Sequence, residues 1–124
     1  MGITKIVRVD DLGNTPARVN RKTGVMYISL KHMKAMPENH RLFVMLHEMG
    51  HVVCQTENEM EADAWAFKEY AKRGHSLTDS VHALTRVLDD RDPEHNWRMY
   101  LQLQRAKEYD YKVNHNTKVY QDGK

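Results

Sequence analysis

Residues 41–63 read RLFVMLHEMGHVVCQTENEMEAD, and their pattern is the clearest structural signal in the chain. Apolar residues recur in it at steps of three and four: Leu42, Met45, Leu46, Met49, Val52 and Val53. Such spacing predicts an amphipathic helix whose apolar stripe faces a core. Pro37 suits the first turn of this helix, which we expect to end near Cys54.

Three more helices are expected after it, over about 57–73, 76–90 and from 92 onward. Thr56 followed by Glu59 fits a capping box at the start of the first, and Gly74 fits its end. Ser76 and Asp79 fit a second capping box. The sequence therefore predicts a helical C-terminal half.

The first thirty residues favour strands. Residues 3–9 form a β-prone run, and residues 17–20 and 25–30 form a hairpin with Gly24 at its turn. We expect 25–30 to be an exposed edge strand. The predicted fold is α+β: a small antiparallel sheet of about three strands followed by about four helices, in a minimal zincin-like architecture. Residues 1–108 would form one domain and residues 109–124 a polar tail.

Composition narrows the class of protein. The chain has 124 residues, of which 40% are hydrophobic and 29% charged, as in ordinary globular domains. Its net charge of +2 comes from interspersed residues, so nucleic-acid binding is not expected. No apolar run approaches the roughly 20 residues of a membrane span. A single cysteine, Cys54, and no secretory h-region indicate a cytoplasmic protein.

The first helix carries His47-Glu48-Met49-Gly50-His51, the pattern H-E-x-x-H. Histidines at i and i+4 share one helical face, so both imidazoles can reach one Zn²⁺. Glu48 is rotated away from the pair and can hold a water on the metal as general base. Gly50 weakens a helix interior, which indicates close packing behind the motif unless it is merely tolerated.

Zinc in such a site needs a third protein ligand. Glu59 and Asp63 share a face of the next helix, so a carboxylate there could complete the set. Asp63 would then accept a hydrogen bond from a ligand histidine. Glu57 and Glu61 are alternative ligands, and Glu59 also serves as a capping residue without any metal.

Residues 41–51 resemble the active-site helix of the ImmA/IrrE-type zinc metallopeptidases, and Glu59-Met60-Glu61-Ala62-Asp63 resembles their E-x-x-A-[ND] glutamate helix. The resemblance implies a gluzincin that hydrolyses peptide bonds in the cytoplasm. It implies that His47, His51 and Glu59 bind zinc, that Glu48 is the general base and that Asp63 supports a ligand. Seven residues between His51 and Glu59 are fewer than is usual in that family.

The family also includes proteins encoded by phages and mobile elements, which often act with a separate DNA-binding regulator. The expected partner here is a peptide or protein substrate. Two other functions stay open: a zinc-binding protein without turnover, and a metal-free helical interaction module. Four residues are open as oxyanion donors, although each also fits a packing or surface role: His75, His82, Arg98 and Tyr100.

Overall fold

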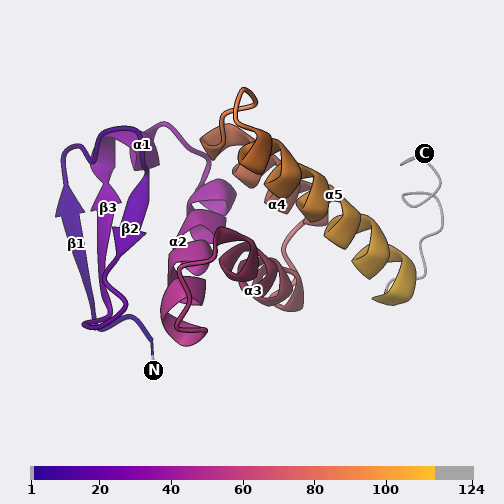
Figure 1. Cartoon of the computed structure of the whole chain (residues 1–124), viewed down its shortest axis with the longest axis horizontal. Coiled ribbons are helices and arrows are strands. Elements are labelled where there is room, and N and C mark those ends of the chain that lie inside the picture. Colours follow the sequence, from indigo (N-terminus) through magenta and orange to yellow (C-terminus); the bar gives the residue numbers. More distant parts are fainter. Residues whose placement is uncertain (1, 114–124) are drawn as a thin grey trace.

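The structure is a computed structural model that describes residues 2–113. It has an α+β fold, as predicted (Figure 1). The strands are β1 (Lys5–Val9), β2 (Ala17–Val19) and β3 (Val25–Ser29), and the helices are α1 (Leu30–Lys34), α2 (Glu38–Val53), α3 (Glu59–Lys72), α4 (Leu77–Val87) and α5 (Pro93–Val113). The sheet lies on one side of α2, and α3, α4 and α5 lie on the other (Figure 1).

The sheet is mixed, with strand order β1-β3-β2, and this corrects two expectations. The hairpin of β2 and β3 is antiparallel, but β1 pairs with β3 in parallel. The strand expected at the edge, β3, is therefore central, and β2 forms the edge next to α2. Residues 10–16 carry the chain across the end of the sheet between its two outer strands (Figure 1). Period-2 alternation specifies which face of a strand is buried, but not which strand lies beside it.

Helix α2 belongs to two hydrophobic clusters at once. Phe43 and Leu46 pack with apolar residues of α3, α4 and α5. Val44 instead packs with the inner face of the sheet, where Met26 and Ile28 are buried. The apolar stripe expected on this helix is thus wide enough to pack against both hydrophobic clusters. The position of α2 between them makes it the central helix of the molecule.

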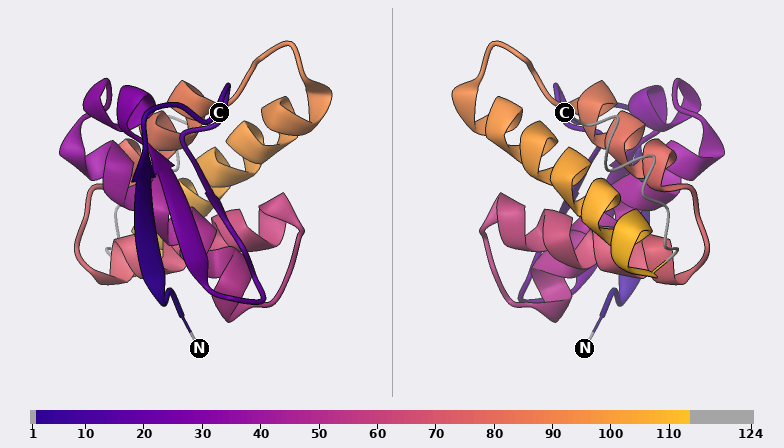
Figure 2. Two further views of the ribbon diagram at one scale, coloured as in Figure 1. Left: turned by 90° about the vertical axis from the view of Figure 1, so that its left-hand side faces the viewer. Right: turned by 90° about the vertical axis from the view of Figure 1, so that its right-hand side faces the viewer.

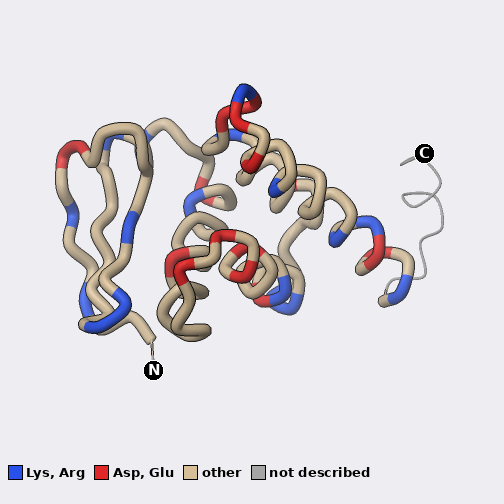
Figure 3. Tube along the Cα trace, viewed as in Figure 1, with Lys and Arg blue, Asp and Glu red and all other residues tan. Residues whose placement is uncertain are grey.

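The expected helix starts and ends are largely present, with one correction. Asn58, not Thr56, caps α3, and its side chain accepts hydrogen bonds from the backbone N–H groups of Met60 and Glu61. Ser76 caps α4 by accepting from Asp79 N–H, as predicted. Acidic residues gather at the start of α3 (Figure 3), where they complement the helix dipole.

Two elements differ from the predicted helices. The short α1 was not expected; Ser29 caps it, and its buried Met33 joins the sheet-side core. Helix α5 runs to Val113, obliquely across the end of the molecule opposite the sheet (Figure 2). The expected polar tail from residue 109 is therefore helical up to 113, because Tyr109 packs against the helical core. Its remaining part, 114–124, lies outside the described residues.

Within residues 2–113, every helix is too short or too polar to cross a lipid bilayer. Lys and Arg residues are spread over both the sheet and the helices, among acidic residues (Figure 3).

Candidate metal centre

Three side chains from two helices converge on one point beside α2. His47 and His51 lie one turn apart on α2, and Glu59 is the first residue of α3. The Nε2 atoms of the histidines are 3.1 Å apart. Glu59 Oε1 lies 3.4 Å from His47 Nε2 and 2.6 Å from His51 Nε2. Among the described residues, this group could hold a metal ion.

A tight reversal of the chain makes this convergence possible. After the C-cap of α2 at Cys54, Gln55 adopts a left-handed backbone with φ of 48°. The N–H of Thr56 then donates to His51 O at 3.1 Å. Asn58 starts α3 directly afterwards, so the short link between His51 and Glu59 suffices.

The alternative carboxylates lie elsewhere. Glu57 is exposed and forms an ion pair with Arg21 of the β2–β3 hairpin at 2.8 Å. Glu61 is exposed on α3 and is not part of the cluster. Of the acidic residues considered as a third ligand, Glu59 alone faces both histidines.

The other ring nitrogens determine how the two histidines point. His51 Nδ1 lies 2.8 Å from the carbonyl oxygen of Thr56, and His47 Nδ1 lies 2.8 Å from Asp63 Oδ1. Both oxygens only accept hydrogen bonds, so each favours a hydrogen on the Nδ1 beside it, and a ring in its neutral form would then direct its Nε2 lone pair at the shared point. Two lone pairs and a carboxylate facing one another are stable only around a cation or a proton.

The distances suit a small divalent cation. In a tetrahedral zinc site with bonds of about 2.0–2.2 Å, ligand atoms lie roughly 3.3–3.6 Å apart. Two of the three separations are close to this range, at 3.1 Å and 3.4 Å. The third, 2.6 Å between His51 and Glu59, is slightly shorter than the roughly 2.7–2.9 Å of a charged N–H···O hydrogen bond. The donor set therefore fits the metal with small side-chain movements.

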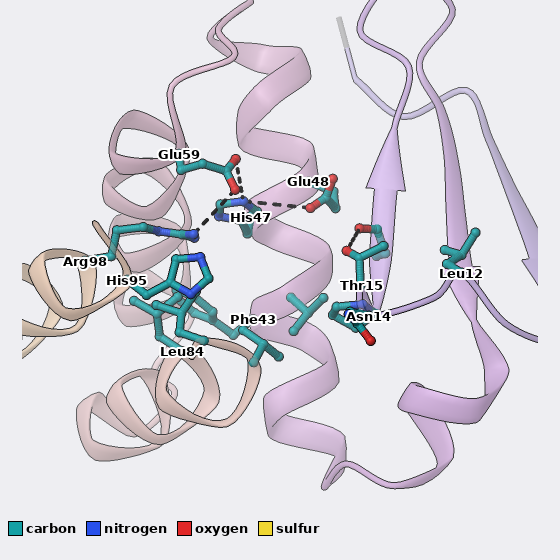
Figure 4. A pocket seen from close by; sticks show the side chains of 15 residues that line it. Leu12, Asn14, Thr15, Phe43, His47, Glu48, Glu59, Leu84, His95 and Arg98 are labelled. Carbon is teal, nitrogen blue, oxygen red and sulfur yellow. Dashed lines mark hydrogen bonds and ion pairs between the residues drawn. The ribbon is translucent and has the colours of Figure 1, made fainter. Parts of the chain in front are cut away.

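Asp63 and Arg98 form a buried ion pair behind His47. Arg98 Nε lies 2.7 Å from Asp63 Oδ2, and Nη2 lies 2.9 Å from Oδ1, which is a bidentate arrangement. Asp63 is fully buried and Arg98 is 5% exposed. Arg98 Nη1 also reaches Glu59 Oε2 at 3.4 Å (Figure 4). Helix α5 thus holds two residues of α3 beside the candidate metal centre through one side chain.

These contacts shift the ionisation of the cluster. Burial opposes the charged form of His47, but its contacts with Asp63 and Glu59 dominate and raise its pKa to about 9. Contact with Glu59 raises the pKa of His51 despite its partial burial. Burial acts against ionised Glu59, yet the two histidines hold the pKa of this carboxyl far below its usual range. Without a metal, the site therefore retains a proton, for which a divalent cation would compete.

Glu48 is separate from the three converging ligands, as its place in the helix predicts. Its Oε2 lies 3.8 Å from His47 Nε2, and the residue is 9% exposed. Burial raises the pKa of this carboxyl. A carboxylate with a raised pKa takes up a proton more readily, which is the property that a general base requires.

Two cavities open on either side of Glu48 and share Thr15, Ala17 and Glu59 in their walls. One, of about 350 Å³, extends toward Phe43 and α4. The other, of about 340 Å³, extends toward Arg18 and Arg21. Residues of edge strand β2 line both, so the two cavities adjoin each other beside the candidate metal centre, and we call the two together the groove.

Of the four residues considered as oxyanion donors, Arg98 is the one that joins the site. His75 stacks on Tyr70, and Tyr100 stacks on the exposed Trp97. His82 lines two other cavities, one between α4 and α5 and one beside His40. Sequence reasoning did not select His95, which lines the groove together with His47 (Figure 4). Its only signal in the sequence was its position three residues before Arg98, nearly one helical turn away.

Comparisons of the chain with known protein families, with curated proteins and with solved structures gave no match.

Proposed function

We propose that this protein is a zinc-dependent peptidase that acts on peptide or protein substrates. The observation that carries the proposal is the convergence of His47, His51 and Glu59 beside the buried carboxylate of Glu48. The resemblance of residues 41–51 and 59–63 to the ImmA/IrrE-type metallopeptidases supports it and favours a cytoplasmic setting.

Zinc bound by the three ligands would supply a Lewis acid that polarises a peptide carbonyl and acidifies a water molecule. Glu48 would accept the proton of that water and later donate it to the leaving amine. Asp63 would keep the hydrogen of His47 on Nδ1, and Arg98 would hold Asp63 in place. Together, these residues prepare the site for hydrolysis.

The edge strand β2 supports binding of an extended peptide. Its partner β3 lies on one side only, and its other edge borders the groove beside Glu48. Unpaired backbone groups at a sheet edge can hydrogen-bond to an added strand. A substrate aligned along residues 17–19 would pass its peptide bonds across the candidate metal centre.

The proposal is tested by counting bound metal per chain with elemental mass spectrometry. We expect about one zinc in the wild type, none in a His47→Ala/His51→Ala double variant and weaker retention in Glu59→Gln. No zinc in the wild type after zinc is supplied and excess removed would overturn the proposal and favour a metal-free interaction module.

Glu48→Gln separates catalysis from metal binding. We expect this variant to retain zinc, because Glu48 is not a ligand, and to lose peptide cleavage by about 10²- to 10⁴-fold. Cleavage is measured by mass spectrometry on a mixed peptide pool. A zinc-loaded wild type that leaves every peptide intact would instead indicate a zinc-binding protein without turnover.

A further inference from the structure

The cavity that extends from Glu48 toward α4 is lined mostly by apolar residues. This cavity lies between α2, the end of α4 and the loop that connects β1 to β2 (Figure 4). Its floor consists of five apolar residues: Phe43, Val44, Leu84, Val87 and Leu88. His47, Glu48 and Glu59 form its border with the candidate metal centre. A side chain that enters the cavity therefore belongs to a residue adjacent to the reacting bond.

Several polar groups that line this cavity already have partners. Thr15 Oγ1 donates to Ala17 O at 3.0 Å, and His95 Nδ1 accepts from Asp89 N–H at 2.9 Å. The guanidinium of Arg98 is engaged by Asp63 and Glu59. Asn14 and Glu48 also line the cavity, but against its five apolar side chains a polar or charged ligand would lose its hydration without gaining hydrogen bonds. An apolar ligand gains from the same desolvation.

The cavity on the other side of Glu48 has a different character. Arg18, Arg21 and Glu57 line it, and no large apolar side chain appears among its described lining residues except Val19. The two halves of the groove thus differ in polarity, with the candidate metal centre between them. A peptide bound along the groove would therefore place residues on one side of the cleaved bond against apolar side chains and residues on the other side against charged ones.

We propose that the cavity over Phe43, Val44 and Val87 binds a large apolar side chain, such as Leu, Met or Phe, of the peptide substrate. This residue flanks the cleaved bond on one side only. The inference rests on the proposed peptidase function for its substrate, but the cavity itself is open to a test without turnover. Its volume of about 350 Å³ is at the lower end of ligand pockets, which suits one side chain rather than a folded segment.

Binding is tested first with zinc-free protein in a chelator, so that no cleavage occurs. Hexapeptides that differ only in a central Phe, Ala or Glu are titrated while the methyl NMR signals of Val44, Leu84 and Val87 are followed. We expect the Phe peptide to shift these signals and to bind about tenfold more tightly than the Ala peptide. Equal responses to all three peptides, or no response at these methyl groups, would overturn the inference.

Two substitutions of Val87 then change the size of the cavity. Val87→Phe fills it and should lower binding of the Phe peptide about tenfold, with little effect on the Ala peptide. Val87→Ala widens it and should retain the Phe peptide, which distinguishes a filled cavity from a damaged fold. Val113→Phe, at an exposed position on α5, is the matched control and should change nothing. Unchanged preference in Val87→Phe would contradict the proposal.

Cleavage distinguishes this inference from the proposed function. In a peptide pool, cleaved bonds should carry Leu, Met or Phe at one flanking position, enriched about tenfold over Ala. Cleavage that depends on Glu48 but lacks this enrichment would overturn the inference and leave the peptidase proposal intact. Selective binding of the Phe peptide without any cleavage would support the apolar cavity and overturn the peptidase proposal.

Discussion

At the residue scale, the candidate metal centre depends on side chains that touch no metal. His47 is oriented by Asp63, and Asp63 is held by Arg98, 35 residues farther along the chain. Both charges are buried, so each depends on the other for compensation. The orientation of the His47 ring therefore depends on the ion pair between Asp63 and Arg98.

Asp63→Asn tests this dependence. The amide keeps the size of the side chain but removes the charge opposite Arg98. We expect the free energy of unfolding to fall by about 3–5 kcal/mol and zinc affinity to fall about 10- to 100-fold. Urea denaturation and zinc titration measure the two effects. The control Asp89→Asn breaks the exposed pair with Arg91 and should change neither; equal effects in both variants would contradict the argument.

At the element scale, the close approach of α2 and α3 places Glu59 opposite the two histidines. Gly50 lies where the helices meet: a Cβ added there would be 3.0 Å from Ala62 O and 3.2 Å from Ala62 Cα. These are backbone atoms of α3, which cannot turn aside as a side chain can. The close packing that Gly50 led us to expect behind the H-E-x-x-H motif is therefore present.

Gly50→Ala tests the packing of these helices. Alanine favours a helix over glycine by about 1 kcal/mol, but overpacking typically costs about 1–3 kcal/mol. We expect a net loss of about 1 kcal/mol in the free energy of unfolding and weaker zinc binding, because α3 must move away with Glu59. Denaturant unfolding and zinc titration provide the measurement. Increased stability with unchanged zinc affinity would show that the two backbones have room to spare.

At the scale of the whole molecule, the candidate metal centre joins elements from different parts of the fold. α2 contributes to both hydrophobic clusters, α3 supplies Glu59, and α5 supplies Arg98. A cation bound between α2 and α3 would therefore stabilise the folded state as a unit, since the unfolded chain does not hold the three ligands together.

Zinc addition should raise the stability of the whole domain. At a free zinc concentration 100 times the dissociation constant, the expected gain is about 2.7 kcal/mol in the free energy of unfolding. The readout is the urea midpoint followed by circular dichroism, with and without zinc. The His47→Ala/His51→Ala double variant should show no gain. A gain of the same size in that variant would place the stabilising ion at another site.

Much of the α+β fold was predictable because its rules are local. A period of 3.6 or 2 and a capping side chain act within a few residues, so the four main helices and the hairpin of β2 and β3 agree with expectation. The turn geometry of the α2–α3 link was less predictable. Gln55 supplies its left-handed residue without being glycine, and Asn58 rather than Thr56 caps the next helix.

The placement of His47, Glu48 and His51 on one helix, with both histidines on one face, could be predicted from the sequence, because it depends only on local apolar spacing and backbone geometry. Three features could be seen only in the folded chain: β1 pairs in parallel, β2 is the edge strand, and Arg98 and His95 line the groove. These outcomes depend on which elements bury their apolar faces together. Such packing is a property of the whole chain and leaves no periodic pattern in any single segment.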